Sequence, residues 1–150
     1  MSRSIEYNGW CVITGEDFRE KFFIKDPTLP KIDNPDFDPS MKEDSANQKT
    51  LFQAKDLTGY TAKMDIRQSA NRSGAILASL ETGLGITIGS PDPTDGSVEL
   101  FIDNLVTNQD PILSAAGTEA FYDIFLIPAL GDNIRLFNGT IRIVESVTNV

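Results

Sequence analysis

From residue 56 onwards, apolar and polar residues alternate over several short segments. The clearest case is Thr61–Arg67, where every second residue is apolar, and Ser97–Ile102 shows a similar alternation. A period of two places successive side chains on opposite faces of a sheet and predicts half-buried β-strands. Further strands are predicted over residues 75–80, 85–88, 120–127 and 134–144. The core between two sheets is expected to contain Ala62, Met64, Ile66, Val98, Leu100, Ile102, Ile124, Leu126, Ile141 and Ile143.

Turn-forming residues separate these segments. Residues 90–96 contain two prolines, two aspartates and a glycine, so the strands on either side of them form a predicted hairpin. Asn138-Gly139 could form a two-residue hairpin turn. A bulge or kink within one long strand is the preferred interpretation, because the flanking segments are too short to pair well alone.

Two more strands are predicted near the N-terminus, at residues 10–13 and 18–25, as neighbours across the turn Thr14–Asp17. One short helix is expected over residues 111–116, where Pro111 suits a first turn and Gly117 a C-terminal stop. Seven or eight short strands with frequent turns are typical of an antiparallel sandwich. The predicted fold is therefore all-β: a single immunoglobulin-like antiparallel β-sandwich domain over residues 1–150, with one short helix.

Residues 27–54 do not follow this pattern. The segment is polar, holds four prolines within thirteen positions and has few large apolar residues. A loop of this length inside a compact domain is usually functional or disordered. We interpret it as an extended insertion arm that lies on a neighbouring subunit; the alternative is a loop that folds back over an edge of its own sheet. The candidate partner-binding residues are Pro30, Pro35, Phe37, Pro39, Leu51 and Phe52.

The charge of the chain argues against nucleic acid as a partner. It has 13 basic and 22 acidic residues, a net charge of −9, which disfavours binding through phosphate neutralisation. Residues 73–134 contain nine acids and no Lys or Arg. This stretch is either a solvated acidic surface or a face that meets a basic partner.

The residue types needed for many kinds of catalysis are missing. The chain has no histidine and one cysteine, which removes His-dependent triads, most zinc and copper sites and an intrachain disulfide. Cys11 lies in an apolar segment and is expected to be a buried, inert thiol. The acid pairs Glu16-Asp17 and Asp92/Asp95 are interpreted as turn residues. We therefore expect no enzymatic activity, no cofactor and no metal site.

Membrane insertion and secretion are not expected either. The longest apolar run, residues 124–130, is far shorter than the ~20 residues of a spanning helix and contains Pro128. The first residues lack the apolar region of a secretory signal. Trp10, Tyr60 and Tyr122 could form a sugar-stacking platform, but the apolar neighbours of Trp10 favour a place in the core.

Several segments resemble small β-sandwich virion proteins of tailed bacteriophages and, more loosely, the attachment domains of phage upper baseplate proteins. The resemblance covers roughly residues 10–26 and 56–148. Residues 27–54 depart from it, since the similar proteins pass almost directly from the first strand pair to the Asp-Leu-Thr-Gly turn. The segments that carry the resemblance are Thr14–Phe18, Asp56–Arg67, Phe121–Leu126, Gly131–Ile143 and Glu145–Thr148.

This resemblance implies a non-enzymatic structural component of a virion, assembled in the host cytoplasm. It points to an adaptor in the tail, baseplate or fibre-attachment region. The expected partners are other virion proteins and further copies of the chain. Two alternatives remain open, a capsid decoration protein and a carbohydrate-binding module that recognises the host surface.

Overall fold

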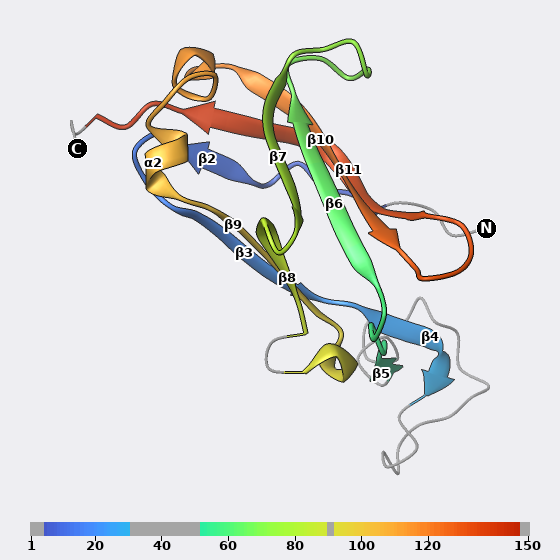
Figure 1. The fold of residues 1–150 in the computed structure, drawn as a ribbon. Helices are drawn as coiled ribbons and strands as arrows, with labels where there is room; N and C mark the ends of the chain where they lie inside the picture. The colour runs from blue at the N-terminus through green and yellow to red at the C-terminus, as the bar shows by residue number, and fades with distance from the viewer. Residues whose placement is uncertain (1–4, 31–51, 90–91, 148–150) are drawn as a thin grey trace.

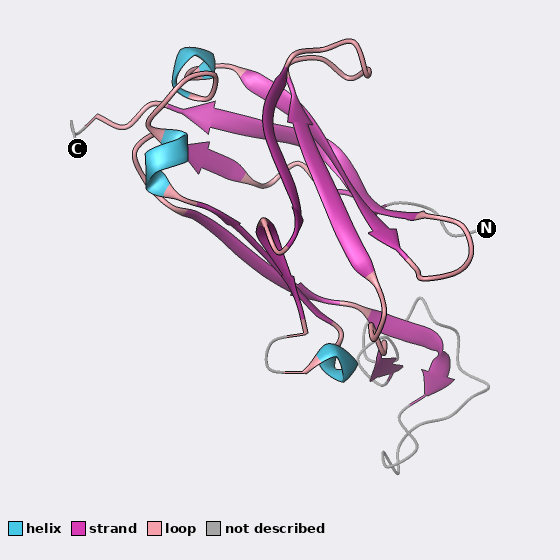
Figure 2. Ribbon diagram, in the orientation of Figure 1, coloured by secondary structure: helices cyan, strands magenta, loops and turns pink. Residues whose placement is uncertain are grey.

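The computed structural model describes residues 5–30, 52–89 and 92–147. Within these ranges most residues lie in β-strands (Figure 2), and the α-helical residues amount to one turn, α2 (Asn104–Thr107). The prediction of an all-β fold is confirmed. No helix in the described part of the chain is long and apolar enough to cross a membrane. The strands are β1 (Ile5–Glu6), β2 (Cys11–Ile13), β3 (Phe18–Phe23), β4 (Lys25–Pro30), β5 (Phe52–Ala54), β6 (Thr61–Arg67), β7 (Ile76–Thr82), β8 (Gly85–Ile88), β9 (Ser97–Ile102), β10 (Glu119–Ile127) and β11 (Ile134–Val144).

Nine of these strands belong to one continuous hydrogen-bonded sheet. Its order is β1-β11-β10-β6-β7-β8-β9-β3, and β2 also pairs with β11. Figure 1 shows the sheet folding over on itself, so that β3, β8 and β9 face β6, β10 and β11. The result is nearly barrel-like. The two remaining strands, β4 and β5, pair with each other in a separate two-stranded ribbon.

The interior between the facing halves of the sheet is filled as the alternation predicts. Buried and less buried residues alternate along β6 and along β10. Ile86 on β8 and Leu100 on β9 are opposite each other in the predicted hairpin, and both are buried. All ten residues predicted for the core are buried. The period of two therefore assigned the inward face of these strands correctly.

The expected pairing of the two N-terminal strands is wrong. β2 runs parallel to β11, with Val12 opposite Ile143, whereas β3 pairs with β9. The turn at residues 14–17 therefore carries the chain from one end of the sheet order to the other. Trp10 packs where these ends approach and is 8% exposed. The centroid of its ring lies 6.3 Å from that of Phe18 and 5.1 Å from that of Tyr122. Burying this aromatic cluster favours closure of the sheet over local pairing.

The predicted helix is only partly correct. Residues 111–116 contain one 3₁₀ turn, η2 (Leu113–Ala115), while the α-helical turn α2 lies earlier. The Asp103 side chain caps α2 by accepting a hydrogen bond from the Leu105 N–H at 2.7 Å. Asp17 accepts one from the Asn104 N–H, also at 2.7 Å, across 87 positions of sequence. A local pattern could not indicate that second contact.

Asn138-Gly139 lies within one long strand, as expected, but the predicted bulge does not fall at these residues: the register of β11 against β10 shifts between Arg135 and Phe137. β11 continues through these residues and pairs with β10 on both sides of them. The N-terminal segment crosses this point so closely that a Cβ on Gly139 would collide with the carbonyl oxygen of Tyr7. Asn8 holds the crossing in place by accepting a hydrogen bond from the Thr140 N–H at 2.8 Å.

Candidate functional sites

The predicted partner-binding residues fall at the β4–β5 ribbon and beyond it. Pro30 and Phe52 are opposite each other at the far end of this ribbon. Pro35, Phe37, Pro39 and Leu51 lie outside the described residues. Figure 1 shows the ribbon leaving the end of the folded sheet and extending away from its core. The structure therefore places the two ends of the predicted arm together, at one end of the molecule.

The root of the ribbon is fixed to the body by backbone hydrogen bonds. The Ile24 N–H donates to the Gly96 carbonyl at 2.7 Å, and the Lys55 N–H donates to the Ile24 carbonyl at 2.9 Å. Gly96 has a φ of 72°, and a Cβ there would collide with the Ile24 carbonyl oxygen. Only glycine fits this position without strain, because other residues rarely adopt a positive φ.

The turn that follows the ribbon has a structural role. The Asp56 carboxylate accepts hydrogen bonds from the Thr58 N–H at 2.9 Å and from the Thr58 hydroxyl at 2.6 Å. These bonds hold the pKa of Asp56 below its ordinary value. Leu57 between them is 1% exposed and packs into the core. The Asp-Leu-Thr-Gly segment thus anchors the ribbon to the sheet.

The acids of residues 73–134 serve local structure at several points. Glu99 forms an ion pair with Arg19 at 3.1 Å. Four aspartates accept hydrogen bonds from groups two to four residues further along the chain. These are Asp92 with Thr94, Asp95 with Ser97, Asp103 with Leu105 and Asp110 with Ser114. The acidic stretch is therefore in part a series of turn and helix caps.

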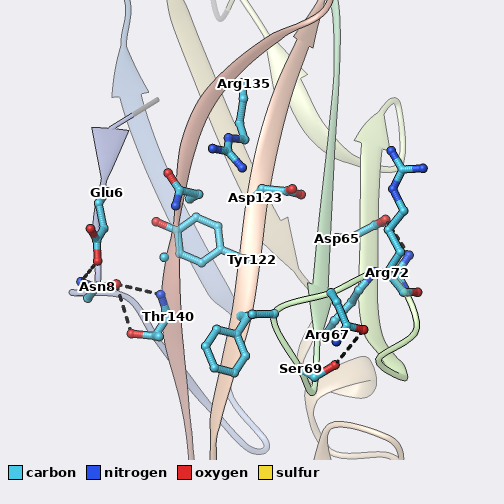
Figure 3. Close-up of a pocket in the computed structure, with 15 residues that line it drawn as sticks. Glu6, Asn8, Asp65, Arg67, Ser69, Arg72, Tyr122, Asp123, Arg135 and Thr140 are labelled. Atoms are coloured by element: carbon cyan, nitrogen blue, oxygen red, sulfur yellow. Dashed lines mark hydrogen bonds and ion pairs between the residues drawn. The ribbon is translucent and has the colours of Figure 1, made fainter. Parts of the chain in front are cut away.

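A pocket of about 390 Å³ lies on the outer side of the sheet, over β6, β10 and β11. The loop between β6 and β7 forms one wall, and the crossing N-terminal segment forms the other (Figure 3). Its lining combines charged, amide, hydroxyl and aromatic groups. Three of the five arginines among the described residues lie here. The main lining residues are Glu6, Asn8, Asp65, Arg67, Asn71, Arg72, Phe121, Asp123, Arg135, Asn138 and Thr140.

Two carboxylates face each other across neighbouring strands in this pocket. Asp123 on β10 is the register partner of Asp65 on β6. Burial and the nearby Asp65 raise the pKa of Asp123, while Arg135 and Arg67 act in the opposite direction. Like charges directly opposite in a sheet are destabilising. This pair is therefore a feature that folding alone does not favour.

Arg67 supports the wall of the pocket. Its guanidinium donates to the backbone carbonyls of Arg72 and Gly74, each at 2.9 Å, and lies 3.4 Å from the Asp65 carboxylate. Asp65 also accepts a hydrogen bond from the Ser79 hydroxyl at 2.5 Å. Asp65 and Arg67 are thus committed to contacts within the protein and hold the β6–β7 loop in place.

The other chemical candidates lie apart in the part of the chain that the structure describes. Among the described residues, no three His, Cys, Asp or Glu side chains come together as a metal site would require. Cys11 is half-buried, so the expectation of a fully buried thiol is wrong. The reason is that β2 pairs with β11 at an end of the sheet, where its other edge is partly exposed. Trp10 and Tyr122 are buried, as the core interpretation of Trp10 predicts, and form no exposed aromatic platform with Tyr60.

Sequence reasoning missed the pocket. Its residues come from four separated segments, and no local motif joins them. One available signal was Asp123, a charged residue within an otherwise apolar strand.

No protein-family model matches the chain, and no curated protein matches its sequence.

Proposed function

We propose that the chain is a non-enzymatic structural component of a tailed-phage virion, an adaptor in the tail, baseplate or fibre-attachment region. We interpret its folded sheet as a variant of the immunoglobulin-like sandwich, with residues 27–54 as an inserted arm. The resemblance described above supports the class of protein. The observation that carries the adaptor role is the β4–β5 ribbon, which extends away from the core at the base of this insertion.

The ribbon is suited to contact a neighbouring subunit. An isolated two-stranded hairpin is marginally stable in water, so a projecting one gains stability from a further surface. Its root is fixed through Ile24 and Gly96, which gives the insertion a defined point of departure from the body. The prolines of the insertion favour extended backbone with free carbonyl groups. Phe37 and Phe52 are the proposed anchors, because aromatic residues dominate the energy of many interfaces.

Replacement of residues 31–51 by a short Gly-Asn-Gly-Ser loop tests this proposal. The design keeps Pro30 opposite Phe52 and leaves the root and the Asp56–Gly59 turn intact. We expect the variant to melt close to the parent and to be absent from purified particles, measured by mass spectrometry of virions from a complemented deletion phage. A matched control replaces Gly131–Asn133, at the turn between β10 and β11, with an unrelated turn of equal length.

Two results would contradict the proposal. A loop-replacement variant that incorporates as well as the parent would show that the insertion is not the adaptor surface. Failure of the variant to fold would instead assign the segment to its own domain, as a cover for a sheet edge. Immunogold labelling of the parent chain separates tail from capsid, since labels on the head would favour a decoration protein.

A further inference from the structure

A row of polar residues crosses four strands: it runs through the pocket over β6, β10 and β11 and ends beside it at Ser79. Asn138 on β11 is opposite Asp123 on β10, Asp123 is opposite Asp65 on β6, and Asp65 is opposite Ser79 on β7. Asp123 and Asp65 both alternate with buried residues, so the two carboxylates share the outer face of the sheet. A like-charged pair at this place costs stability and calls for an explanation beyond folding.

Three charged side chains of this pocket lack a close partner among the residues that the structure describes. Within the described part of the chain, the side chains of Asp123, Arg72 and Arg135 make no hydrogen bond and no ion pair within 4.0 Å, unlike Asp65 and Arg67. Figure 3 shows Asp123 between Arg135 on one side and Asp65 on the other, with Arg72 beyond Asp65. The pocket therefore presents one acceptor and two cationic donors that are available to a ligand.

The mixture of charges restricts the class of ligand. A simple anion would be attracted by the arginines but repelled by the carboxylates of Asp123 and Asp65. A simple cation would be repelled by three guanidinium groups. A ligand without polar groups would leave several charges desolvated, which is costly. The lining instead fits a molecule with hydroxyl donors for a carboxylate and an anionic group for guanidinium. Phe121 adds an apolar surface at the same site.

We propose that this pocket binds an acidic saccharide, a hexuronic acid residue within a glycan. Its ring hydroxyls donate to the Asp123 carboxylate and its own carboxylate accepts from Arg135, which lies beside Asp123. The apolar face of the ring packs on Phe121, while Asn138 and Thr140 line the neighbouring wall. The cavity volume lies within the usual range for small-ligand sites. This inference does not depend on the chain being a virion protein.

Ligand-observed NMR and calorimetric titration with methyl β-D-glucuronide and methyl α-D-galacturonide test the site. We expect saturable binding of at least one of these glycosides, and weaker binding of the matching neutral glycoside, which lacks the carboxylate. Arg135→Gln should weaken uronide binding about tenfold or more, the size expected for loss of a charged hydrogen bond, and should affect the neutral glycoside little. Asp123→Asn should weaken both, because hydroxyl groups are common to both.

Arg142→Gln is the matched control, since Arg142 lies on the same strand but outside the pocket. It makes the same change of charge and should leave binding as in the parent. Asp123→Asn, which removes the like-charged pair with Asp65, provides a second test if Arg135→Gln fails to fold. Absence of saturable uronide binding would overturn the proposal. Three other results would also overturn it. These are equal affinities for neutral and acidic glycosides, equal losses of affinity in Arg135→Gln and Arg142→Gln, and equally tight binding of glycine as a zwitterion.

Discussion

Replacement of Ile66 by alanine tests the register of β6 at the centre of the core. Ile66 is 1% exposed, whereas Ile76 on the paired strand β7 is 46% exposed and serves as a matched control. Each change removes three carbon atoms from the side chain. Burial of each such methylene or methyl group contributes about 0.8 kcal/mol to the free energy of unfolding. For Ile66 the transfer loss is about 2.4 kcal/mol, and the cavity left behind brings the total to about 2–5 kcal/mol. For Ile76 about half of the side chain is already in water, so the loss is about 1 kcal/mol.

Urea unfolding followed by tryptophan fluorescence measures both variants. Trp10 is the only tryptophan of the chain and is buried, so its emission reports exposure of the core. Ile66→Val should cost about 0.5–1.5 kcal/mol and provides an intermediate point. Ile66→Asp would bury an unpaired charge and should abolish cooperative unfolding. If Ile66→Ala loses no more stability than Ile76→Ala, the assignment of the inward face of β6 is wrong.

Three further changes test individual contacts by thermal or chemical unfolding. Burial and the nearby Asp65 raise the pKa of Asp123 in the folded protein, so the fold favours the protonated carboxyl. Asp123 therefore does not reduce the free energy of unfolding below the ordinary carboxyl pKa, and reduces it as the pH rises through the raised pKa. Asp123→Asn should therefore stabilise the protein at neutral pH, by about 0.2–1 kcal/mol, and not in acid; equal effects at both pH values would contradict this. Asp103→Ala removes the cap of α2 and should cost about 0.5–2 kcal/mol, whereas no loss would show the cap to be unimportant. Gly96→Ala forces a side chain against the Ile24 carbonyl and should lower the free energy of unfolding by about 1–3 kcal/mol, with faster hydrogen exchange in β4 and β5. Unchanged exchange in these strands would show that Gly96 does not hold the ribbon in place.

Local alternation was enough to predict most strands and, in those that alternate, the inward side. In β6, β9, β10 and β11 the period of two follows from the geometry of a single extended backbone, so Met64, Leu100, Ile124 and Ile141 could be assigned to the core without knowledge of their neighbours. Glycine and proline likewise predicted the turn between β8 and β9, whereas the bulge in β11 falls between Arg135 and Phe137 and not at the predicted Asn138-Gly139. These features depend on contacts within a few residues.

The candidate sites could be predicted only in part. The composition of residues 27–54 predicts an insertion, but the attachment of the β4–β5 ribbon through Ile24 and Gly96 joins segments far apart in the sequence. The pocket depends on the pairing of β11, β10 and β6, which brings Arg135, Asp123 and Asp65 to one surface. No spacing within one segment encodes that arrangement.

By itself, the sequence determined that this protein is all-β and which side chains of its alternating strands face the core. The tertiary structure decided which strands pair. It placed β2 beside β11 and β3 beside β9, because closing the sheet around Trp10 buries more aromatic surface than a local hairpin would. The period of a strand is a property of its own backbone, whereas its partner is selected by burial summed over the whole chain.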